Sequence, residues 1–161
     1  MNFLDILLLI FPSYVANAVP VLLGNAIPID NILGIKIFGK NKTLRGLIGG
    51  ISAGVLVSYF LSFFTSLNPI VYIQIGILLS IGTMAGDLLG SFIKRLLRIK
   101  EGDPFFLDPI LFIIFALALS FPLLKNLLTF YDIIFILILT YFLHIIMNRI
   151  ANILGLKRVP W

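Results

Sequence analysis

The sequence predicts an all-α, polytopic membrane protein with five transmembrane helices. Of its 161 residues, 60% are hydrophobic and only 12% are charged, and the mean hydropathy is +1.14. A soluble domain is about half apolar and roughly one quarter charged. Five apolar stretches each approach the length of about 20 residues that spans a bilayer. We therefore expect a single membrane-embedded domain over residues 1–161.

Each expected helix follows from an apolar stretch and the residues that interrupt it. The apolar run from Gly46 to Gly86 is too long for one helix, and Asn68-Pro69 divides it. The first stretch lacks the basic amino-terminal region of a signal peptide, so we expect a retained helix. The five helices are expected near residues 6–23, 47–66, 70–92, 109–124 and 132–151.

The lysines and arginines predict the orientation. Eleven of the twelve fall on one side of the predicted bundle, and only Lys125 falls on the other. Because basic residues concentrate on the cytoplasmic side of membrane proteins, we expect the amino terminus outside and the carboxyl terminus in the cytoplasm. The connections near 24–46 and 94–107 are then cytoplasmic, and a site in the cell membrane would open to the cytoplasm. The bases on that side are Lys36, Lys40, Lys42, Arg45, Lys94, Arg95, Arg98, Lys100, Arg149, Lys157 and Arg158.

Composition excludes several kinds of site. The chain has no cysteine, which rules out disulfides and thiolate metal sites, and its single histidine rules out a multi-histidine metal site within one chain. The expected partners include membrane lipids and no nucleic acid, and a homo-oligomer remains possible.

The stretch Gly86-Asp-Leu-Leu-Gly-Ser-Phe-Ile-Lys-Arg95 follows a segment, 67–86, that carries no charge. Asp87 therefore falls where the chain still has the composition of a membrane span, and an ionisable residue there indicates a functional site. A carboxylate beside cations suits a metal-bound polyphosphate. The alternative is a helix end whose bases reach the membrane surface and pair with the acid. Spacings of three and four place these residues on one helix face: Asp87, Gly90, Ser91, Lys94 and Arg98.

The first cytoplasmic connection contains Gly39-Lys-Asn-Lys-Thr-Leu-Arg-Gly46. Glycines beside lysines let backbone N–H groups and ammonium groups approach phosphate oxygens together. Thr43 precedes a long helix and is a candidate amino-terminal cap, and a helix amino terminus favours anions. The spacing is not that of a P-loop. The alternative is a flexible basic loop that attracts anionic lipid headgroups.

Asp108 stands at the start of the fourth expected helix. The third helix descends to the cytoplasm and the fourth returns, so Asp87 and Asp108 can approach each other across an antiparallel pair. Two carboxylates together with substrate phosphates form a typical Mg²⁺ environment. We expect Asp108 to be a metal ligand, and the alternative is a cap of its own helix.

Polar residues are sparse within the apolar spans. Asn17 and Asn25 lie late in the first helix and just beyond it. His144 has no partner residue for nucleophilic catalysis, so we expect it to make an interhelical hydrogen bond. Three glycines are expected to permit close helix packing: Gly49, Gly50 and Gly54.

Over essentially its whole length the chain resembles the CDP-archaeol synthases, membrane cytidylyltransferases related to the CDP-diacylglycerol synthases. Its most specific part is the Gly86–Arg95 stretch with the later Leu107-Asp108. One departure is Leu111, which stands where we expect the family to have a second acid, three residues after Asp108. The resemblance also rests on Gly39–Gly46 with Ile48-Gly-Gly50, on Tyr14-Val-Ala-Asn17, and on the ending Leu154–Trp161.

The resemblance implies an Mg²⁺-dependent transfer of CMP from CTP to 2,3-di-O-geranylgeranylglyceryl phosphate, an archaeal ether-lipid phosphate, giving CDP-archaeol and pyrophosphate. Asp87 and Asp108 would then hold the metal and, with Lys94, act in catalysis. Asn17 and Asn25 would bind the lipid phosphate. A basic cavity with a carboxylate floor would suit a lipid phosphate in the bilayer and a triphosphate entering from the cytoplasm. The residues expected to bind CTP and its phosphates are Lys36, Gly39, Lys42, Thr43, Arg45, Ser91, Lys94 and Arg95.

Three other functions are alternatives to this one. A small transporter would use Asp87 as a coupling-ion site, but no polar pathway continues to the outer face and no paired repeats are found. A CDP-alcohol phosphatidyltransferase would require Asp-Gly-x-x-Ala-Arg with further spaced aspartates, which this chain lacks. A structural subunit of a membrane complex would explain the small size but not the acidic and basic residues that share one helix face.

Overall fold

The computed structural model describes all residues except 1, 24–25, 101–102, 104, 158 and 161. The described residues form α-helices with one isolated antiparallel bridge, between Pro28 and Thr43. This confirms the all-α prediction. The helices are α1 (Phe3–Leu23), α2 (Ile29–Leu33), α3 (Leu44–Leu61), α4 (Pro69–Leu96), α5 (Asp108–Leu124) and α6 (Phe130–Ile153).

Four of these helices, α1, α3, α4 and α6, are long and apolar enough to cross a membrane. The apolar α5 is shorter, with 17 residues. Asn68 caps α4 by accepting a hydrogen bond from Ile70 N at 2.9 Å, and Pro69 occupies the first turn, as the predicted break requires.

Some predicted boundaries were wrong. The second helix was predicted to extend to residue 66, but α3 ends at Leu61 because the chain enters a series of turns there. The third helix was predicted to end near residue 92, but α4 continues to Leu96. The connection predicted at 94–107 therefore begins later than expected. Within the 24–46 connection, the five-residue α2 was not predicted, since so short a helix gives no readable periodicity.

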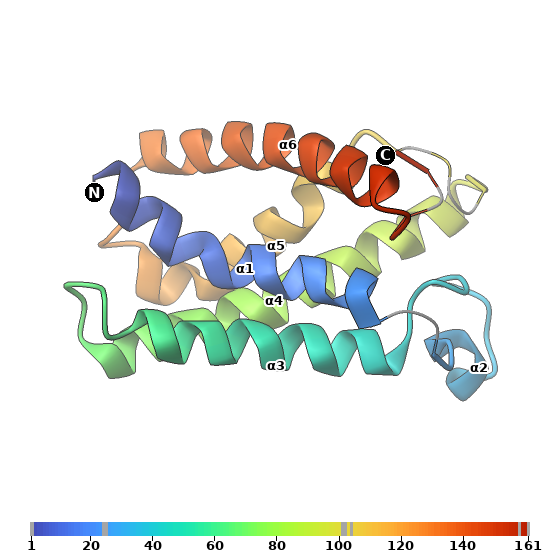
Figure 1. The fold of residues 1–161 in the computed structure, drawn as a ribbon, viewed down its shortest axis with the longest axis horizontal. Helices are drawn as coiled ribbons and strands as arrows, with labels where there is room; N and C mark the ends of the chain where they lie inside the picture. Colours follow the sequence, from blue (N-terminus) through green and yellow to red (C-terminus); the bar gives the residue numbers. More distant parts are fainter. Residues whose placement is uncertain (1, 24–25, 101–102, 104, 158, 161) are drawn as a thin grey trace.

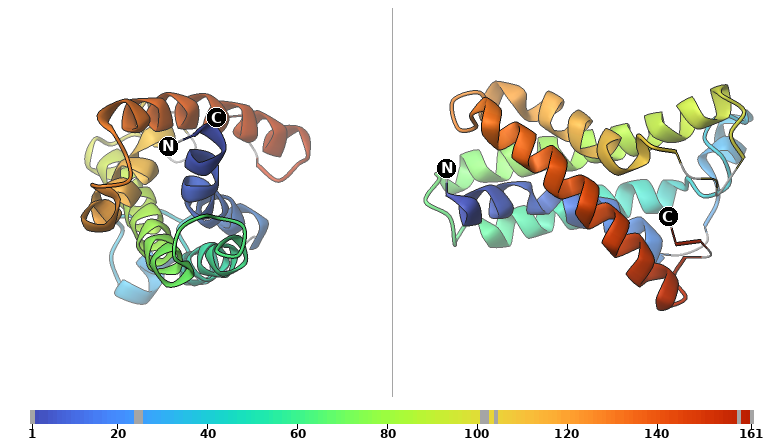
Figure 2. Two further views of the ribbon diagram at one scale, coloured as in Figure 1. Left: turned by 90° about the vertical axis from the view of Figure 1, so that its left-hand side faces the viewer. Right: turned by 90° about the horizontal axis from the view of Figure 1, so that it is seen from above.

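The long helices form an elongated bundle, with the start of α1 and the end of α6 toward opposite ends (Figure 1). α3 and α4 run side by side, and α1 packs on α3. α6 crosses diagonally over the other helices, which is clearest in the right-hand view of Figure 2. The α2 segment, the start of α3, the last turns of α4 and the end of α6 all lie toward the same end of the bundle. These segments and the connections beside them carry most of the lysines and arginines.

Glycines let the helices approach closely, as predicted. A Cβ added at Gly50 would lie 2.6 Å from the Ala16 carbonyl oxygen of α1, and one at Gly54 would lie 2.2 Å from Ser80 Oγ of α4. α4 meets α5 in the same way through Gly82 and Gly86. α4 is therefore fixed on one side by α3 and on the other by α5, and it positions the side chains that follow Gly86.

We expect Gly82→Ala to separate α4 from α5. The added Cβ would lie 2.6 Å from the Phe115 carbonyl oxygen and 2.7 Å from Ala116 Cα, which are backbone atoms that cannot turn aside. Overpacking of this kind costs about 1–3 kcal/mol. Gly49→Ala is the matched control, because its Cβ would meet only Leu23 Cδ1, the end of a flexible side chain. Thermal unfolding in detergent should show a lower Tm for Gly82→Ala than for Gly49→Ala, and equal values would contradict this packing.

The hydrophobic core packs residues from the first half of α1 against α4, α5 and α6, and two tyrosine hydroxyls add polar contacts. Tyr72 of α4 donates to the Leu8 carbonyl of α1 at 2.6 Å, and Tyr14 of α1 shares a 2.8 Å hydrogen bond with Thr140 of α6. α6 is otherwise the least buried of the four long helices. The largest buried apolar side chains of this core include Leu9, Ile10, Tyr72, Ile75, Leu79, Ile113 and Ile136.

Candidate functional site

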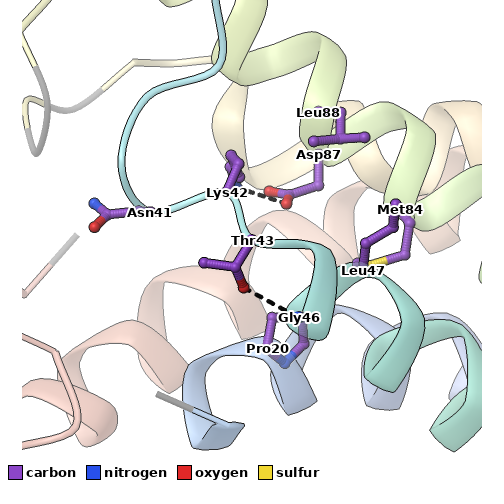
Figure 3. A pocket seen from close by; sticks show the side chains of 9 residues that line it. All are labelled: Pro20, Asn41, Lys42, Thr43, Gly46, Leu47, Met84, Asp87 and Leu88. Atoms are coloured by element: carbon purple, nitrogen blue, oxygen red, sulfur yellow. Dashed lines mark hydrogen bonds and ion pairs between the residues drawn. The ribbon is translucent and has the colours of Figure 1, made fainter. Parts of the chain in front are cut away.

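The first half of the site is an ion pair between the first connection and α4. Lys42 Nζ lies 2.5 Å from Asp87 Oδ2, and the two side chains are 23% and 32% exposed (Figure 3). The backbone holds Lys42 in place, because Ile29 N donates to its carbonyl oxygen at 2.8 Å. Thr43 is the amino-terminal cap of α3, as predicted, and its hydroxyl accepts from Gly46 N at 3.0 Å. The connection therefore presents the ammonium group to α4 in a defined position.

A pocket of about 310 Å³, which includes space open to solvent, adjoins this ion pair. Figure 3 shows Lys42 and Asp87 pointing toward each other at one side of it, with the cap at Thr43 beside them. The pocket is lined by Pro20, Asn41, Lys42, Thr43, Gly46, Leu47, Met84, Asp87 and Leu88.

The second half is an ion pair between the end of α4 and the start of α5. Lys94 Nζ lies 2.7 Å from Asp108 Oδ2 and also donates to the Asp103 carbonyl oxygen at 2.8 Å. Asp108 does not cap α5, since the cap position is Leu107 and no side chain caps there. A Cβ added at Gly90 would lie 3.8 Å from Asp108 Oδ1, so the glycine leaves room beside this carboxylate.

The predicted face of α4 is present from Asp87 to Lys94 but does not extend to Arg98. Gly90 on this face is buried, and Ser91 is half-buried. α4 ends at Leu96, and Arg98 adopts a left-handed conformation with φ +58° in the turn that follows. The Ile99 and Arg98 N–H groups return to the carbonyls of Lys94 and Arg95 at 2.9 and 3.0 Å. This turn directs the chain away from the face.

Asp30 of α2 shapes the first connection, and the sequence analysis missed it. Its buried carboxylate accepts from Gly39 N at 2.8 Å and from Phe38 N at 3.0 Å. Burial by itself would raise the pKa of Asp30. Hydrogen bonds from the backbone N–H groups of Gly39, Phe38 and Ile37, together with the charge of Arg95, lower the pKa by more than burial raises it. The pKa therefore lies below its usual value. The stabilisation that this carboxylate provides is present above its unfolded-state pKa and is lost as the pH falls through the lower folded-state pKa.

Gly39 has φ +94°, a conformation that glycine adopts without strain. Its N–H group, predicted to approach phosphate, is directed to Asp30. Arg95, which we expected at the phosphates, acts electrostatically on the same carboxylate, and its Nε is buried without a hydrogen-bond partner among the described residues. In the sequence, a lone acid in a connection between apolar spans resembles a solvated charge, so only the folded structure reveals this role.

The other predicted residues are placed as follows. Lys36 and Arg45 are exposed, and Asn17 is half-buried in α1, whereas Asn25 lies outside the described residues. The ring of His144 in α6 packs against Phe112 of α5, with centroids 5.8 Å apart, which is an interhelical ring contact. The predicted hydrogen bond of His144 stays a prediction.

The carboxylates suit a cation that also binds substrate oxygens. Asp87 and Asp108 are each about one third exposed, at 32% and 33%, and each already accepts a cationic group. Across the described part of the chain, no cluster of three or more acidic, histidine or cysteine side chains could hold a metal ion. Mg²⁺ commonly takes one or two carboxylates and completes its shell with water and phosphate oxygens. The donor set therefore fits Mg²⁺ delivered with a polyphosphate.

The chain is similar to known proteins over nearly its whole length. A family model described as CarS-like, CDP-archaeol synthase, matches residues 1–161. The CDP-archaeol synthase of Thermococcus gammatolerans is 43% identical, with 94% of this chain and 92% of the relative covered. The CDP-archaeol synthase of Archaeoglobus fulgidus is 36% identical, with 95% and 94% covered.

A solved structure of an intramembrane enzyme for archaeal membrane lipids biosynthesis is similar over nearly all of the fold. Its TM-score is 0.81 at 30% sequence identity, and the alignment covers 91% of this chain and 94% of the other.

Proposed function

The chain belongs to the CDP-archaeol synthase family, and we propose that the pairs Lys42–Asp87 and Lys94–Asp108 form its catalytic centre. The enzyme transfers CMP from CTP to an archaeal ether-lipid phosphate, giving CDP-archaeol and pyrophosphate for membrane lipid synthesis. The observation that carries the proposal is the pairing of both predicted carboxylates with predicted phosphate-binding lysines. Those four residues come from three separate segments of the chain.

The ion pairs define how charges are exchanged when substrates bind. Without substrate, each aspartate compensates one lysine, so neither charge is left without a partner. A triphosphate that arrives with Mg²⁺ brings a cation for the carboxylates and oxygens for the ammonium groups. Asp87 and Asp108 would then hold the metal, while Lys42 and Lys94 turn to the phosphates. Bound Mg²⁺ would neutralise triphosphate charge and help to orient the α-phosphate.

The reaction requires little acid–base chemistry from the protein. An oxygen of the lipid phosphate attacks the α-phosphorus of CTP and forms the new P–O bond. The bond from the α-phosphorus to the bridging oxygen breaks, and pyrophosphate leaves with that electron pair. The attacking phosphate is already anionic, so no strong general base is needed. Positioning and charge stabilisation by the lysines account for the catalysis.

The basic residues at one end of the bundle support an arrangement in which the lipid stays in the bilayer while CTP enters from the cytoplasm. We assign the basic end of the bundle to the cytoplasm, with α1, α3, α4, α5 and α6 as five spans and the amino terminus outside. The whole chain is then one catalytic domain in the cell membrane. Lys36, Thr43, Arg45 and Ser91 remain assigned to CTP, and Asn17 and Asn25 to the lipid phosphate.

A membrane-impermeant label should reach a cysteine at position 125 only from outside and one at position 100 only from the cytoplasm. Cytoplasmic labelling at 125 would contradict the five-span orientation.

A transporter with Asp87 as its coupling-ion site receives no support from this site. Asp87 is paired with Lys42 near the basic end of the bundle, and the relatives named above are lipid-synthesis enzymes. A one-sided site is sufficient for an enzyme that draws one substrate from the bilayer and the other from the cytoplasm.

The experiment is a nucleotide panel with the purified protein in detergent. The geranylgeranyl ether-lipid phosphate and Mg²⁺ are supplied with each nucleoside triphosphate in turn, and nucleotide-labelled lipid is measured. CTP should give CDP-lipid, and chelation by EDTA should abolish the reaction. Absence of labelled lipid with every triphosphate would overturn the proposed function.

A further inference from the structure

The chain reverses direction immediately after α6. Gly155 has φ +72°, in the left-handed region that glycine occupies without strain. Its N–H donates to the Asn152 carbonyl at 3.0 Å, and Leu156 N donates to the Ala151 carbonyl at 2.8 Å. These two bonds form a Schellman motif. Lys157 consequently lies back along the last turns of α6 rather than beyond them; we call residues 154–157 the C-terminal hook.

Two asparagines of α6 hold Lys157 in this hook. Its Nζ donates to Asn148 Oδ1 at 2.9 Å, and its carbonyl oxygen accepts from Asn152 Nδ2 at 2.9 Å. A lysine in an untethered tail would extend its ammonium group into water. Here the group is half-buried and fixed at both ends of the residue.

The hook faces the catalytic centre. The ring of His144 packs against Phe112 of α5 at 5.8 Å. One turn further toward the basic end of the bundle, α6 has Asn148 and α5 has Asp108. Asn148, which accepts from Lys157, and Asp108 are therefore each one turn from this ring contact, on the two helices that it joins.

The electrostatic environment of Lys157 agrees with this placement. Burial lowers the pKa of Lys157, and the positive charges of Lys42 and Lys94 lower it too, whereas the carboxylates of Asp108 and Asp87 raise it. All four charged residues of the catalytic centre thus lie close enough to act on this one ammonium group.

We propose that the C-terminal hook supplies Lys157 to the catalytic centre as a third phosphate-binding lysine. This proposal rests on the proposed function and extends it to a residue outside the two ion pairs. The ligand is a phosphate group of a substrate, either the lipid phosphate or the triphosphate of CTP. Lys157 would approach from the end of α6, whereas Lys42 comes from the first connection and Lys94 from α4, so three separate segments would supply cations to the centre.

The test is Lys157→Gln, with Arg149→Gln as the matched control. Arg149 is an exposed base near the same end of α6, so both variants lose one positive charge from the same region. We expect Lys157→Gln to lose about tenfold in kcat/KM, with Lys157→Arg partly restored and Arg149→Gln near wild type. A weaker Kd for the lipid phosphate alone would identify the lipid as the source, and a weaker Kd for CTP with Mg²⁺ would identify the nucleotide.

Gly155→Ala tests the hook while keeping the lysine. The substitution strains the left-handed conformation, and we expect it to change the same Kd as Lys157→Gln, by a smaller factor. If both variants lower only the Tm, or if Lys157→Gln matches Arg149→Gln in all constants, the inference is wrong while the proposed function stands. If the wild-type protein makes no nucleotide-lipid, the proposed function itself fails, and the inference fails with it.

Discussion

Asp87→Asn should remove turnover almost completely, by about a thousandfold or more, while the protein stays folded. The amide keeps the size of the side chain and an oxygen that can accept from Lys42, but it lacks the negative charge that a divalent cation requires. The effect on stability should be small, because the ion pair with Lys42 is partly exposed, at 23% and 32%, and such pairs contribute about 0–1 kcal/mol.

The measurement is kcat in detergent with saturating CTP and lipid phosphate, together with Tm. Asp103→Asn is the matched control, because Asp103 is an exposed acid that contacts Lys94 through its backbone carbonyl. It should keep most of its activity. A wild-type rate for Asp87→Asn would remove this carboxylate from the catalytic centre. Raising the Mg²⁺ concentration should restore little of the rate, since the substituted side chain offers only a neutral oxygen.

Lys42→Ala should cost about 3 kcal/mol of transition-state stabilisation, on the order of a hundredfold in rate. Lys42 is held by the backbone bond from Ile29 and already lies on Asp87, so it is positioned before the substrate arrives. If the lysine served only to attract anionic lipid, its contribution would be about 1 kcal/mol.

CTP binding separates these two roles of Lys42. Thermal shift with CTP and Mg²⁺ should show weaker affinity for Lys42→Ala, and Lys125→Ala, an exposed lysine at the other end of the bundle, should match wild type. A loss smaller than about threefold in both rate and affinity would favour the lipid-attraction role.

Local patterns predicted those parts of the fold that depend on neighbouring residues. Asn68-Pro69 ends one apolar run and starts another because proline suits the first helical turn and asparagine caps it. Thr43 likewise caps the start of α3. The glycines of α3 indicated close packing, but the sequence did not identify the backbone carbonyl of Ala16 as the atom that Gly50 approaches.

The partners within the site depend on tertiary packing and could not be predicted from spacing. Lys42 and Asp87 are 45 positions apart, and they meet because α3 and α4 pack side by side. The sequence analysis placed both residues at phosphates or metal but did not pair them. Asp30 was missed because its function is to bind backbone N–H groups of its own loop, which leaves no motif.

The end of α6 gives a second example. Lys157 contributed to the predicted orientation as one of several bases, and its direction is set by the left-handed Gly155 and by Asn148. A glycine followed by a lysine at the end of an apolar helix is compatible with many chain directions. The reversal becomes specific only when the capping bonds and the asparagine are known.

The stoichiometry of pyrophosphate release tests the central claim most directly. The purified protein in detergent micelles, where no gradient can exist, is given CTP, the ether-lipid phosphate and Mg²⁺, and both products are quantified. We predict one pyrophosphate for each CDP-lipid formed, and none when the lipid phosphate is omitted. Pyrophosphate release without lipid phosphate, or no release under any condition in micelles, would contradict a catalytic centre that joins the lipid phosphate to the nucleotide.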